Sequence, residues 1–573
     1  MPIHNSDIER IFSEVADLLE IEGANPYRVR AYRNAAQTMS TMSGNVVDMV
    51  AEGEDLTELP GIGEELAAKI EEIVKTGGLQ QLEELHRRMP AELVDMLKIA
   101  GLGPKRVQTI YEELNVTSLD KLRHAAESEE IRKLHGLGEK TEQKIIEELE
   151  DWSEQREERT LLAVAEEQVD PLLDFLRGLE DVEQVEAAGS YRRKKETVGD
   201  LDLLVISDTG EEIISQFVEY EDVEEIVSQG ETRSSVAFRS GLQVDLRVVA
   251  EESYGAAIVY FTGSKAHNIH LRNMAVDKGL KVNEYGVFKG EERIAGRKEK
   301  EIYDLFDLPV IAPELRENRG EIEAAQKGEL PDLIKVEDIC GDLQAHTTAS
   351  DGRSSLEEMA RTARELGYEY FAITDHSAYI GVTQGLDANE LAEQIEEIER
   401  LNEEMEDINL LKSVEVDIIE DGSLDLPDDI LSKLDLVVCA IHSKFDLPSE
   451  EQTERIIRAM DNPHVNILAH PTGRRINERD PIDIDIERVM DAALERGCFL
   501  EINAQPRRLD LNDIYCKMAR DRGLKLSIST DAHSTEELEF MRYGVYQARR
   551  GWLEAEDILN TRSWDELKEL LKR

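Results

Sequence analysis

The sequence predicts a multidomain protein in which an all-helical N-terminal region precedes a middle α/β region and a C-terminal βα-repeat barrel or layered fold. The chain has 573 residues, and at roughly 150 residues per domain about four domains are expected. Apolar residues recur at helical spacing in the first part, form strand patterns from about residue 160, and alternate between strand and helix patterns beyond residue 338.

Three glycine-containing turns, each leading into a helical pattern, recur in the first 150 residues: Leu59-Pro60-Gly61-Ile62-Gly63, Ile99-Ala100-Gly101-Leu102-Gly103 and Leu134-His135-Gly136-Leu137-Gly138. Two glycines let the backbone approach a ligand, and the next helix directs its N–H groups toward a phosphate. One such turn is explained equally well as a helical corner with a glycine cap. Three copies favour binding to a nucleic-acid backbone, and they resemble the helix-hairpin-helix motif, which implies K⁺ or Na⁺ at the turns.

Strand patterns define the rest of the chain. In the middle region, strands are expected at residues 183–188, 200–207, 224–227 and 242–250, and an α/β pattern continues to about residue 315. The polar, acidic stretch that follows, residues 316–334, is the best candidate for a linker. Beyond it, helical patterns alternate with strand patterns at residues 370–374, 436–440, 466–469 and 499–503. This alternation is typical of a βα-repeat barrel.

The chain is strongly acidic. It has 67 Lys and Arg against 124 Asp and Glu, a formal net charge of −57, and Arg outnumbers Lys by 42 to 25. Acids spread over every segment together with few lysines are typical of proteins from halophilic archaea, in which salt screens like-charge repulsion. Cations still collect near the motifs, because residues 24–47, 189–195 and 255–276 contain no carboxylate. DNA therefore remains a feasible partner.

The N-terminus does not resemble a signal peptide, and no run of 18 apolar residues is present, so a cytoplasmic protein is expected. The chain has four cysteines and no C-x-x-C pair. Reduced core thiols are therefore expected instead of disulfides or a cysteine-based zinc site.

Two aspartates on one predicted strand are the main chemical signal of the middle region. Asp200 and Asp202 share one face of their strand, and Asp245, on another predicted strand, is the natural third acid. Three such carboxylates can hold two divalent ions about 3.5–4 Å apart for phosphoryl transfer. A D-x-D pattern alone is more often a solvated strand edge, but the Gly-Ser turn at 189–190, with Arg193 beside it, adds donors for a triphosphate.

This segment resembles the nucleotidyltransferase signature of the DNA polymerase X family, and Tyr260-Phe261-Thr262-Gly263-Ser264 resembles the family's sugar-contacting turn. The match to the polymerase β type covers about residues 1–315. It implies a palm and thumb, two Mg²⁺ or Mn²⁺ ions on the three aspartates, and Asp245 as the base for the primer 3′-hydroxyl. It also implies contact with the template strand by Arg272 and nucleotide binding by Gly189, Ser190, Arg193, Gly199, Tyr260, Phe261 and Asn268.

The same resemblance places the family's 5′-deoxyribose phosphate lyase lysine at Lys69, in the helix after the first glycine turn. A surface lysine on an amphipathic helix is an equal alternative. Glu65 stands where the polymerase β pattern has a basic residue, so this chain departs from the pattern beside Lys69.

Histidines gather at the ends of predicted strands in the last part of the chain. Five of the six histidines beyond residue 335 stand there with three acids, and a barrel brings such ends around one mouth. A single histidine is usually structural, but this set favours a multinuclear site for Zn²⁺, Mn²⁺ or Fe²⁺. Its members are His346, Asp351, His376, Glu415, His442, His470, Asp531 and His533.

The set resembles the PHP (polymerase and histidinol phosphatase) domain over about residues 335–573. The resemblance implies a distorted (β/α)7-like barrel that holds two or three Zn²⁺ or Mn²⁺ ions and acts as a phosphoesterase. The family's first motif is H-x-H, and Gln344 replaces its first histidine here, so one metal would be held weakly. Arg474 or Arg507 could neutralise the phosphate, and a solvated surface role is equally open for both.

Together these features predict a family X DNA polymerase that fills short gaps with dNTPs in DNA repair, including base excision repair, as a monomer. Its PHP domain would process 3′ ends as a 3′–5′ exonuclease or 3′-phosphatase, with incision at abasic sites left open. A non-catalytic PHP domain and a non-DNA acceptor are the alternatives. The predicted segments are a helical domain with the first hairpin (1–80), a second helical DNA-binding domain (81–155), a palm (156–250), a nucleotide-selecting subdomain (251–315), a linker (316–334) and the PHP domain (335–573).

The acidic composition generates a prediction about salt. Because unscreened repulsion in a chain of charge −57 opposes compaction, we expect far-UV circular dichroism in dilute buffer to show a loss of helix that molar KCl restores. Sucrose stabilises folded proteins without screening charge and should not replace KCl. A fully folded, active protein without added salt would contradict the halophilic interpretation.

Overall fold

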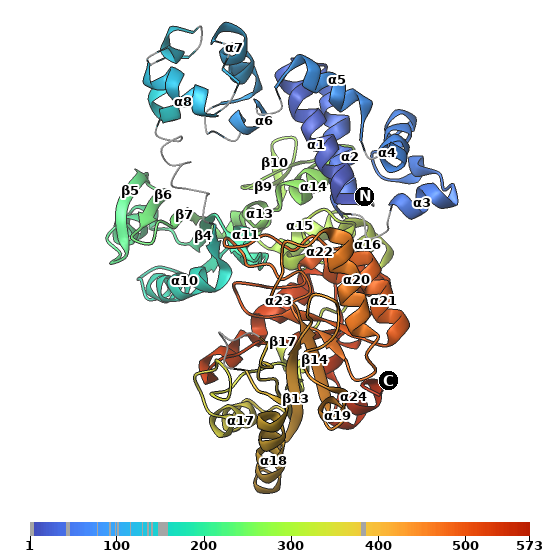
Figure 1. Ribbon diagram of the computed structural model, residues 1–573. Helices are drawn as coiled ribbons and strands as arrows, with labels where there is room; N and C mark the ends of the chain where they lie inside the picture. Colours follow the sequence, from blue (N-terminus) through green and yellow to red (C-terminus); the bar gives the residue numbers. More distant parts are fainter. Residues whose placement is uncertain are drawn as a thin grey trace. The chain divides into compact units, whose positions relative to one another are not determined.

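The computed structural model describes residues 5–41, 46–76, 78–90, 93–97, 99, 102–114, 116–117, 119–128, 130–134, 137–138, 141–146, 159–379 and 385–572. They belong to two compact units, residues 1–158 and 159–573, and each unit is described by itself (Figure 1). Among the described residues, no helix is both long enough and apolar enough to cross a membrane.

The N-terminal unit is helical wherever it is described, as the sequence predicts. Apolar side chains at helical spacing, such as Ile8, Phe12 and Val15 of the first helix, point into one core that all the helices share. The elements are α1 (Asn5–Ile21), α2 (Pro26–Thr41), α3 (Val46–Glu52), η1 (Leu56–Glu58), α4 (Glu64–Thr76), α5 (Gln80–Arg88), α6 (Leu93–Met96), α7 (Pro104–Leu114), α8 (Leu119–Glu127) and η2 (Ile131–Lys133).

The three glycine turns share one backbone geometry. In each, the residue between the glycines donates its N–H to the carbonyl three residues earlier, and the second glycine accepts a hydrogen bond from the residue four positions later. Gly61 has a φ of +75°, which glycine adopts without strain. Gly63 and Gly103 directly precede α4 and α7, and Gly138 precedes a helical turn at 141–146. Gly101 and Gly136 lie outside the described residues.

Residues 159–250 form the expected palm around a five-stranded sheet in the order β2-β4-β7-β6-β5, in which only β4 and β7 pair in parallel. Helices α10 and α12 pack their apolar faces on one side of this sheet. The sequence did not predict β6, because serines at 234 and 235 interrupt its apolar pattern. The elements are β1 (Thr160–Leu161), α10 (Leu162–Arg177), β2 (Gln184–Ala187), α11 (Gly189–Arg192), β3 (Thr197–Val198), β4 (Asp200–Ile206), α12 (Gly210–Phe217), β5 (Val223–Gln229), β6 (Arg233–Phe238) and β7 (Gln243–Val249).

Residues 251–315 add helices and a three-stranded antiparallel sheet in the order β10-β9-β8. The first helix, α13, covers the second face of the palm sheet through Tyr254, Ala257 and Ile258. The elements are α13 (Glu251–Thr262), α14 (Lys265–Asp277), β8 (Lys281–Asn283), β9 (Gly286–Lys289), β10 (Glu292–Ala295), α15 (Glu299–Asp304) and η3 (Pro313–Leu315).

Residues 316–334, predicted as a linker, are packed into the fold instead. Arg316 is fully buried, with its Nη1 2.6 Å from a carboxylate oxygen of Glu299 and two further donors on the carbonyl of Ile311. Glu321 opens helix α16 (Glu321–Lys327) and is also buried, 2.7 Å from Nδ1 of His267. The prediction was wrong because these charged side chains are buried against partners in the preceding subdomain, Glu299 for Arg316 and His267 for Glu321.

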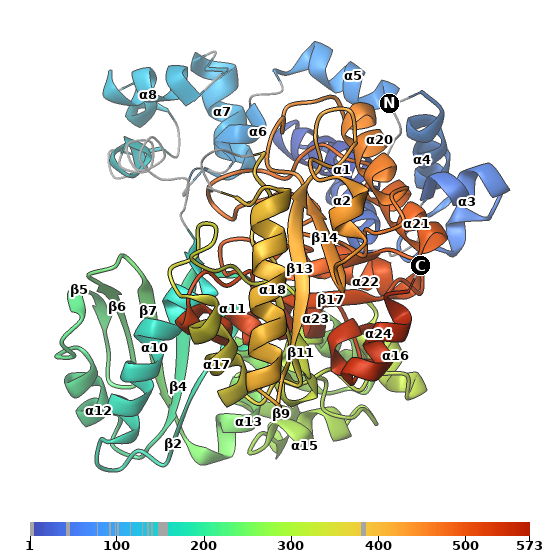
Figure 2. The ribbon, with the colours of Figure 1, turned by 60° about the horizontal axis from the view of Figure 1, so that its bottom comes forward.

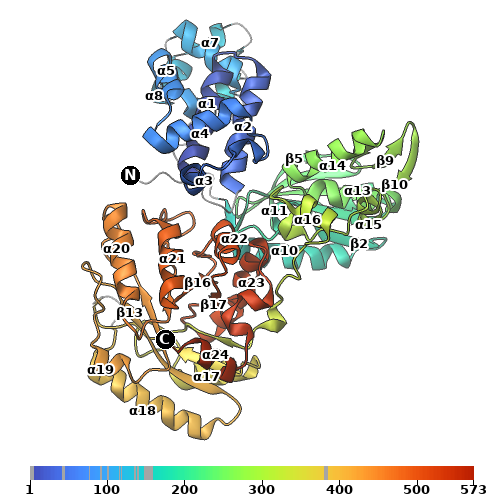
Figure 3. The same cartoon turned by 90° about the vertical axis from the view of Figure 1, so that its right-hand side faces the viewer.

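Residues 335–572 form the expected barrel. Seven parallel strands follow one another in chain order, and a parallel bridge between Ala345 and Ala532 nearly closes the sheet. The helices lie around the strands (Figures 2 and 3). The strands are β11 (Gly341–Asp342), β12 (Tyr370–Ile373), β13 (Asn409–Asp417), β14 (Leu436–Ala440), β15 (Ile467–Leu468), β16 (Phe499–Asn503) and β17 (Leu526–Ser529).

Strand alternation separates the barrel interior from the surrounding helices. On β14, Val438 and Ala440 belong to an inner apolar cluster that Leu567 of α24 joins, whereas Val437 and Cys439 pack in the outer one. The elements outside the strands are η4 (Val336–Asp338), α17 (Leu356–Glu365), α18 (Ala388–Glu404), α19 (Asp428–Leu431), α20 (Ser449–Met460), α21 (Ile486–Arg496), α22 (Asp513–Asp521), η5 (Thr535–Phe540), α23 (Met541–Arg550), η6 (Ala555–Asp557), η7 (Leu559–Thr561) and α24 (Trp564–Leu570).

The buried Arg316 generates a stability prediction. Arg316→Met removes a cation from Glu299, which is then left with Arg192 at 3.0 Å, so we expect a loss of about 3–5 kcal/mol, seen as a lower calorimetric melting temperature. Lys300→Met, which removes an exposed pair with Asp304, is the matched control and should cost less than about 1 kcal/mol. Equal decreases in melting temperature for the two variants would show that the buried ion pair contributes no more stability than the exposed one.

Candidate functional site

The three predicted carboxylates of the palm come together on the parallel pair β4–β7. Asp202 lies directly opposite Asp245 in the strand register, and Asp200 precedes Asp202 on the same face. Nη2 of Arg247 lies 3.7 Å from a carboxylate oxygen of Asp202 and 3.5 Å from one of Asp245. The strand pairing therefore gives the three acids one common location.

The charges of this cluster are poorly balanced by the protein itself. Burial raises the pKa of Asp202 to about 6, the Asp200 carboxylate adds to the increase, and Arg247 opposes it. Even with Arg233 acting in the same direction as Arg247, the pKa of Asp202 stays above its ordinary value. Carboxylate oxygens are the ligands that hard divalent cations prefer. These residues therefore fit divalent cations.

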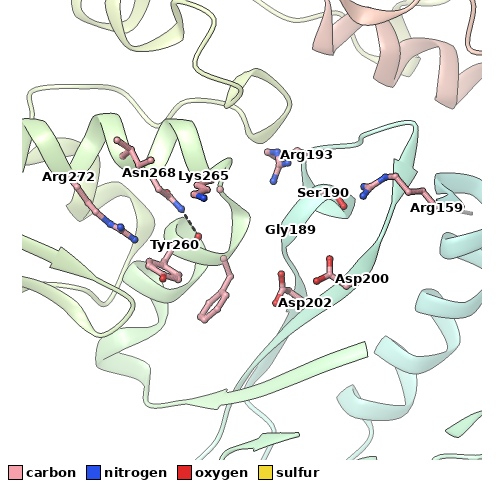
Figure 4. Close-up of a pocket in the computed structure, with 13 residues that line it drawn as sticks. Arg159, Gly189, Ser190, Arg193, Asp200, Asp202, Tyr260, Lys265, Asn268 and Arg272 are labelled. Carbon is pink, nitrogen blue, oxygen red and sulfur yellow. Dashed lines mark hydrogen bonds between the residues drawn. The ribbon is translucent and has the colours of Figure 1, made fainter. Parts of the chain in front are cut away.

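Asp200 and Asp202 lie on one wall of a pocket of about 410 Å³ (Figure 4). The opposite wall comes from α13 and α14, and Arg193 extends from the end of α11 toward the space between the two walls. All the predicted nucleotide-binding residues except Gly199 line this pocket. Its described lining is Arg159, Gly189, Ser190, Arg193, Asp200, Asp202, Tyr260, Phe261, Gly263, Lys265, Asn268, Ile269 and Arg272.

Gly189 and Gly199 leave room for neighbouring side chains at and beside the pocket. Gly189 has a φ of +60°, and a Cβ there would lie 3.1 Å from a carboxylate oxygen of Asp202. A Cβ at Gly199 would lie 2.8 Å from Nη1 of Arg159. Glycine at 189 therefore lets the turn approach the Asp202 carboxylate closely, and glycine at 199 leaves room for the Arg159 guanidinium.

Side chains on the opposite wall hold one another in place. The guanidinium carbon of Arg272 lies 5.2 Å from the ring centroid of Tyr260, and that of Arg247 lies 4.4 Å from the ring centroid of Phe261. Nδ2 of Asn268 donates to the carbonyl of Tyr260 at 2.6 Å. The wall therefore presents two aromatic rings in fixed orientations.

Sequence reasoning missed Arg159, Lys265 and Ile269, which complete the pocket lining. Nε of Arg159 donates to the hydroxyl of Thr197 at 3.0 Å, which holds the arginine beside the carboxylates. No local motif marks Arg159, because the strand β3 that positions it lies almost 40 residues later.

The eight predicted ligands of the barrel gather at one end of its strands. Their ligand atoms form overlapping groups within 4.8 Å, namely His346, Asp351, His376 and His533; His376, Glu415 and His442; and His346, Glu415 and Asp531. His470 joins them because its Nε2 lies 3.0 Å from Oε1 of Glu415. The strand-end pattern of the sequence is thus realised as a single cluster.

This cluster fits metal ions in its donor chemistry. Nδ1 of His346 and Nδ1 of His470 are buried without a hydrogen-bond partner among the described residues. Nε2 of His346 and Nδ1 of His376 lie 3.0 and 3.1 Å from carboxylate oxygens of Asp531 and Glu415. Burial lowers the pKa of His376 to about 4, which leaves it neutral and able to bind a metal at pH 7. Imidazoles mixed with carboxylates suit Zn²⁺ or Mn²⁺.

Asp417 is a further residue of this cluster that the sequence did not reveal. Its carboxylate lies 2.9 Å from Nδ1 of His442 and so directs Nε2 of that ring toward Glu415. Burial acts to lower the pKa of His442, but Glu415 and Asp417 outweigh it and raise the pKa to about 10. A metal at Nε2 would therefore displace a proton.

Gln344 occupies the position of the first histidine of the H-x-H motif. It is fully buried, and neither its Oε1 nor its Nε2 has a hydrogen-bond partner in the described part of the chain. The bridge formed by Ala345 leaves Gln344 and His346 on the same face of an extended segment. Gln344 therefore offers the cluster a neutral, weaker ligand.

Of the two arginines offered for the phosphate, Arg507 has the surface role that was left open, and Arg474 forms an ion pair with the palm. Arg474 pairs with Glu196 of the palm at 2.7 Å, and Arg507 pairs with Glu478 at 3.0 Å on the surface. Arg508 is the arginine at the cluster, with its Nε 3.4 Å from a carboxylate oxygen of Asp531.

Lys69 lies in a setting that favours the charged amine. Its Nζ contacts the Glu65 carboxylate and lies 5.6 Å from the ring centroid of Tyr32. Burial acts to lower the pKa of Lys69, but Glu65 and Tyr32 outweigh it and raise the pKa. A Schiff-base nucleophile must be neutral, so these contacts favour the non-catalytic alternative for Lys69, although its side chain is only 14% exposed.

Comparison with known proteins agrees with this geometry. The protein is 38% identical over 578 residues to "DNA polymerase/3′-5′ exonuclease PolX" of Bacillus subtilis (strain 168), with 100% of both chains covered. The chain belongs to the DNA polymerase X family. Family models described as DNA polymerase beta thumb, helix-hairpin-helix domain, SAM-like helix-hairpin-helix tandem and PHP domain match residues 257–317, 3–79, 93–151 and 342–505.

The PHP domain of this family X chain also has shorter relatives. It is 33% identical over 244 residues to a "Probable phosphatase" of Thermoanaerobacter sp. (strain X514), which covers 40% of this chain and 94% of the relative. Another relative so named, from Acetivibrio thermocellus, is 32% identical over 34% of this chain and 80% of its own. The predicted helix-hairpin-helix regions, polymerase β-like thumb and PHP domain are confirmed, and these domains imply DNA binding and divalent metals.

Gln344 generates a prediction about metal content. Gln344→His restores an imidazole beside His346, so we expect about one more Zn²⁺ or Mn²⁺ per chain after dialysis, measured by inductively coupled plasma mass spectrometry. His464→Gln, at the one histidine of this domain outside the cluster, is the control and should leave the metal content unchanged. Equal metal content in wild type and Gln344→His would mean that Gln344 limits no metal site.

Proposed function

We propose that this protein is a DNA-directed DNA polymerase that fills short gaps in damaged DNA and trims 3′ ends with its PHP domain. The observation that carries the proposal is the convergence of Asp200, Asp202 and Asp245 beside a pocket that also contains Arg193 and Tyr260. The Bacillus subtilis relative is named for both activities.

In the palm, Asp200, Asp202 and Asp245 would hold two Mg²⁺ or Mn²⁺ ions. Such ions favour ionisation of the attacking hydroxyl and neutralise the transferred phosphate. The Asp245 carboxylate takes up the proton of the primer 3′-hydroxyl, and Gln243 and Arg247 orient it from 3.2 and 3.5 Å.

The remaining pocket residues orient the nucleotide. Ser190 and Arg193 bind the triphosphate, which Gly189 and Gly199 allow to approach the backbone. Tyr260 and Phe261 line the deoxyribose, Asn268 reaches the base edge, and Arg272 contacts the template strand. Fixed rings and a fixed guanidinium reduce the entropy lost when the nucleotide binds.

In the PHP domain, the eight-residue cluster would hold two or three Zn²⁺ or Mn²⁺ ions. Such ions activate water and neutralise a phosphodiester. Arg508 faces the same space from beside Asp531 and would bind a phosphate oxygen, in place of Arg474 or Arg507. Trimming suits gap filling, because a polymerase needs a free 3′-hydroxyl. The same protein would therefore produce the 3′-hydroxyl that its polymerase site extends.

The glycine turns would bind the DNA backbone at Gly61, Gly63, Gly101, Gly103, Gly136 and Gly138, with K⁺ or Na⁺ bound at the turns. Their common hydrogen-bond pattern supports this role, because it exposes the next helix terminus to a phosphate. We place the protein in the cytoplasm as a monomer on gapped or nicked DNA.

Asp202→Asn tests the polymerase. Removing one shared carboxylate should lower kcat/KM for one-nucleotide gap filling by about 100-fold or more, measured by extension of a labelled primer. Asp208→Asn, at an exposed aspartate just after β4, is the control and should be neutral. Untemplated transfer to another acceptor, without extension of gapped DNA by the wild type, would instead favour the non-DNA nucleotidyltransferase.

His376→Ala tests the PHP domain, and Arg508→Ala tests the phosphate contact. Both should reduce 3′ trimming by about 100-fold while gap filling on an unblocked primer persists, and Arg508→Ala should keep the bound metal. His464→Ala is the control for histidine loss. Unchanged trimming in His376→Ala combined with a lower melting temperature would favour a non-catalytic scaffold.

A further inference from the structure

Residues 193–196 of the palm are held by side chains of the PHP domain. This triphosphate-binding segment begins with Arg193, the arginine proposed to bind the triphosphate. Three of its residues, Arg193, Lys194 and Glu196, each contact a different PHP residue. Nη1 of Arg550 donates to the carbonyl of Arg193 at 2.8 Å, Nζ of Lys194 lies 4.6 Å from the ring centroid of Tyr546, and Nη2 of Arg474 lies 2.7 Å from the carboxylate of Glu196.

Arg550 is the centre of these contacts. Its side chain is only 3% exposed, and besides Arg193 it reaches Glu317 at 3.1 Å and Asp513 at 2.7 Å. The same oxygen of Glu317 accepts from Nε of Arg193 at 3.0 Å. Arg550 therefore holds Arg193 twice, directly through its backbone carbonyl and through Glu317 at its guanidinium.

Further contacts between the PHP domain and the palm surround the ion pairs of Arg550. Tyr543 donates to Glu166 of α10 at 2.9 Å, and the same carboxylate lies 2.9 Å from Nζ of Lys194. Tyr543 and Leu509 of the PHP domain are buried in the apolar core of the palm. Helix α23 accordingly lies beside α10 and α11 (Figures 1 and 3).

We propose that the PHP domain sets the nucleotide affinity of the polymerase site, with Arg550, Tyr546 and Arg474 as positioning residues for the triphosphate-binding segment. A segment held in its binding conformation loses less freedom when the triphosphate arrives. The carboxylates of β4 and β7 make none of these contacts with PHP side chains, so the effect falls on binding more than on the chemical step. This inference rests on the proposed function of the pocket.

The test compares two adjacent arginines of α23 in the full-length protein. Arg550→Gln should raise both the KM for dNTP in gap filling and the Kd of a fluorescent dNTP by about tenfold, with kcat within about twofold and 3′ trimming unchanged. Arg549→Gln is the matched control, because Arg549 pairs with Glu314 at 2.8 Å and does not touch the segment. It should leave KM and Kd unchanged, and Arg550→Lys should lie between wild type and Arg550→Gln.

Other outcomes overturn the inference. If Arg549→Gln and Arg550→Gln change KM equally, or if Arg550→Gln lowers kcat and trimming together, the boundary has only a structural role. Should Arg550→Gln not fold, Tyr546→Ala and Arg474→Gln take its place, and unchanged Kd values in both contradict the proposal. Absence of dNTP binding by the wild type would instead reject the proposed function of the pocket.

Discussion

The structure depends on how buried charge is balanced in a chain of net charge −57. Carboxylates that leave water must meet cations, and arginine supplies them at the boundaries between layers. Arg316 forms an ion pair with Glu299, and Arg550 forms ion pairs with Glu317 and Asp513. The excess of arginine over lysine therefore has a structural meaning beyond the surface, since a planar guanidinium reaches several acceptors at once.

Where arginine does not balance the acids, the residues fit metal ions. In the palm cluster, Arg247 pairs with Asp202 and Asp245, and Asp200 has no ion pair within the described residues. The barrel cluster combines carboxylates with histidines that keep ring nitrogens without hydrogen bonds there. Both clusters arise because neighbouring parallel strands bring their ends together. The pairing of parallel strands therefore positions the residues of both the palm cluster and the barrel cluster, although the two sheets are unrelated.

Features that depend on short stretches of sequence could be predicted, and features that depend on contacts outside a local motif could not. Local patterns were reliable: the described parts of the glycine turns, the D-x-D strand and the histidines at strand ends lie where expected. The strand β6 was missed because serines at 234 and 235 interrupt its apolar pattern. The packed segment after Arg316 was missed because its charged residues pair inside the protein, as Arg316 does with Glu299. Arg159 and Arg508 were missed because neither belongs to a local motif.

The sequence by itself determined the chemical inventory of this protein and its division into helical, palm and barrel regions, because periodicity and short motifs are local properties of the chain. Only the tertiary structure decided which acids share a cation, which arginine faces the barrel cluster, and that Arg550 holds Arg193 across more than 350 residues. Such contacts depend on the burial and register of distant segments, and no spacing along the chain encodes them.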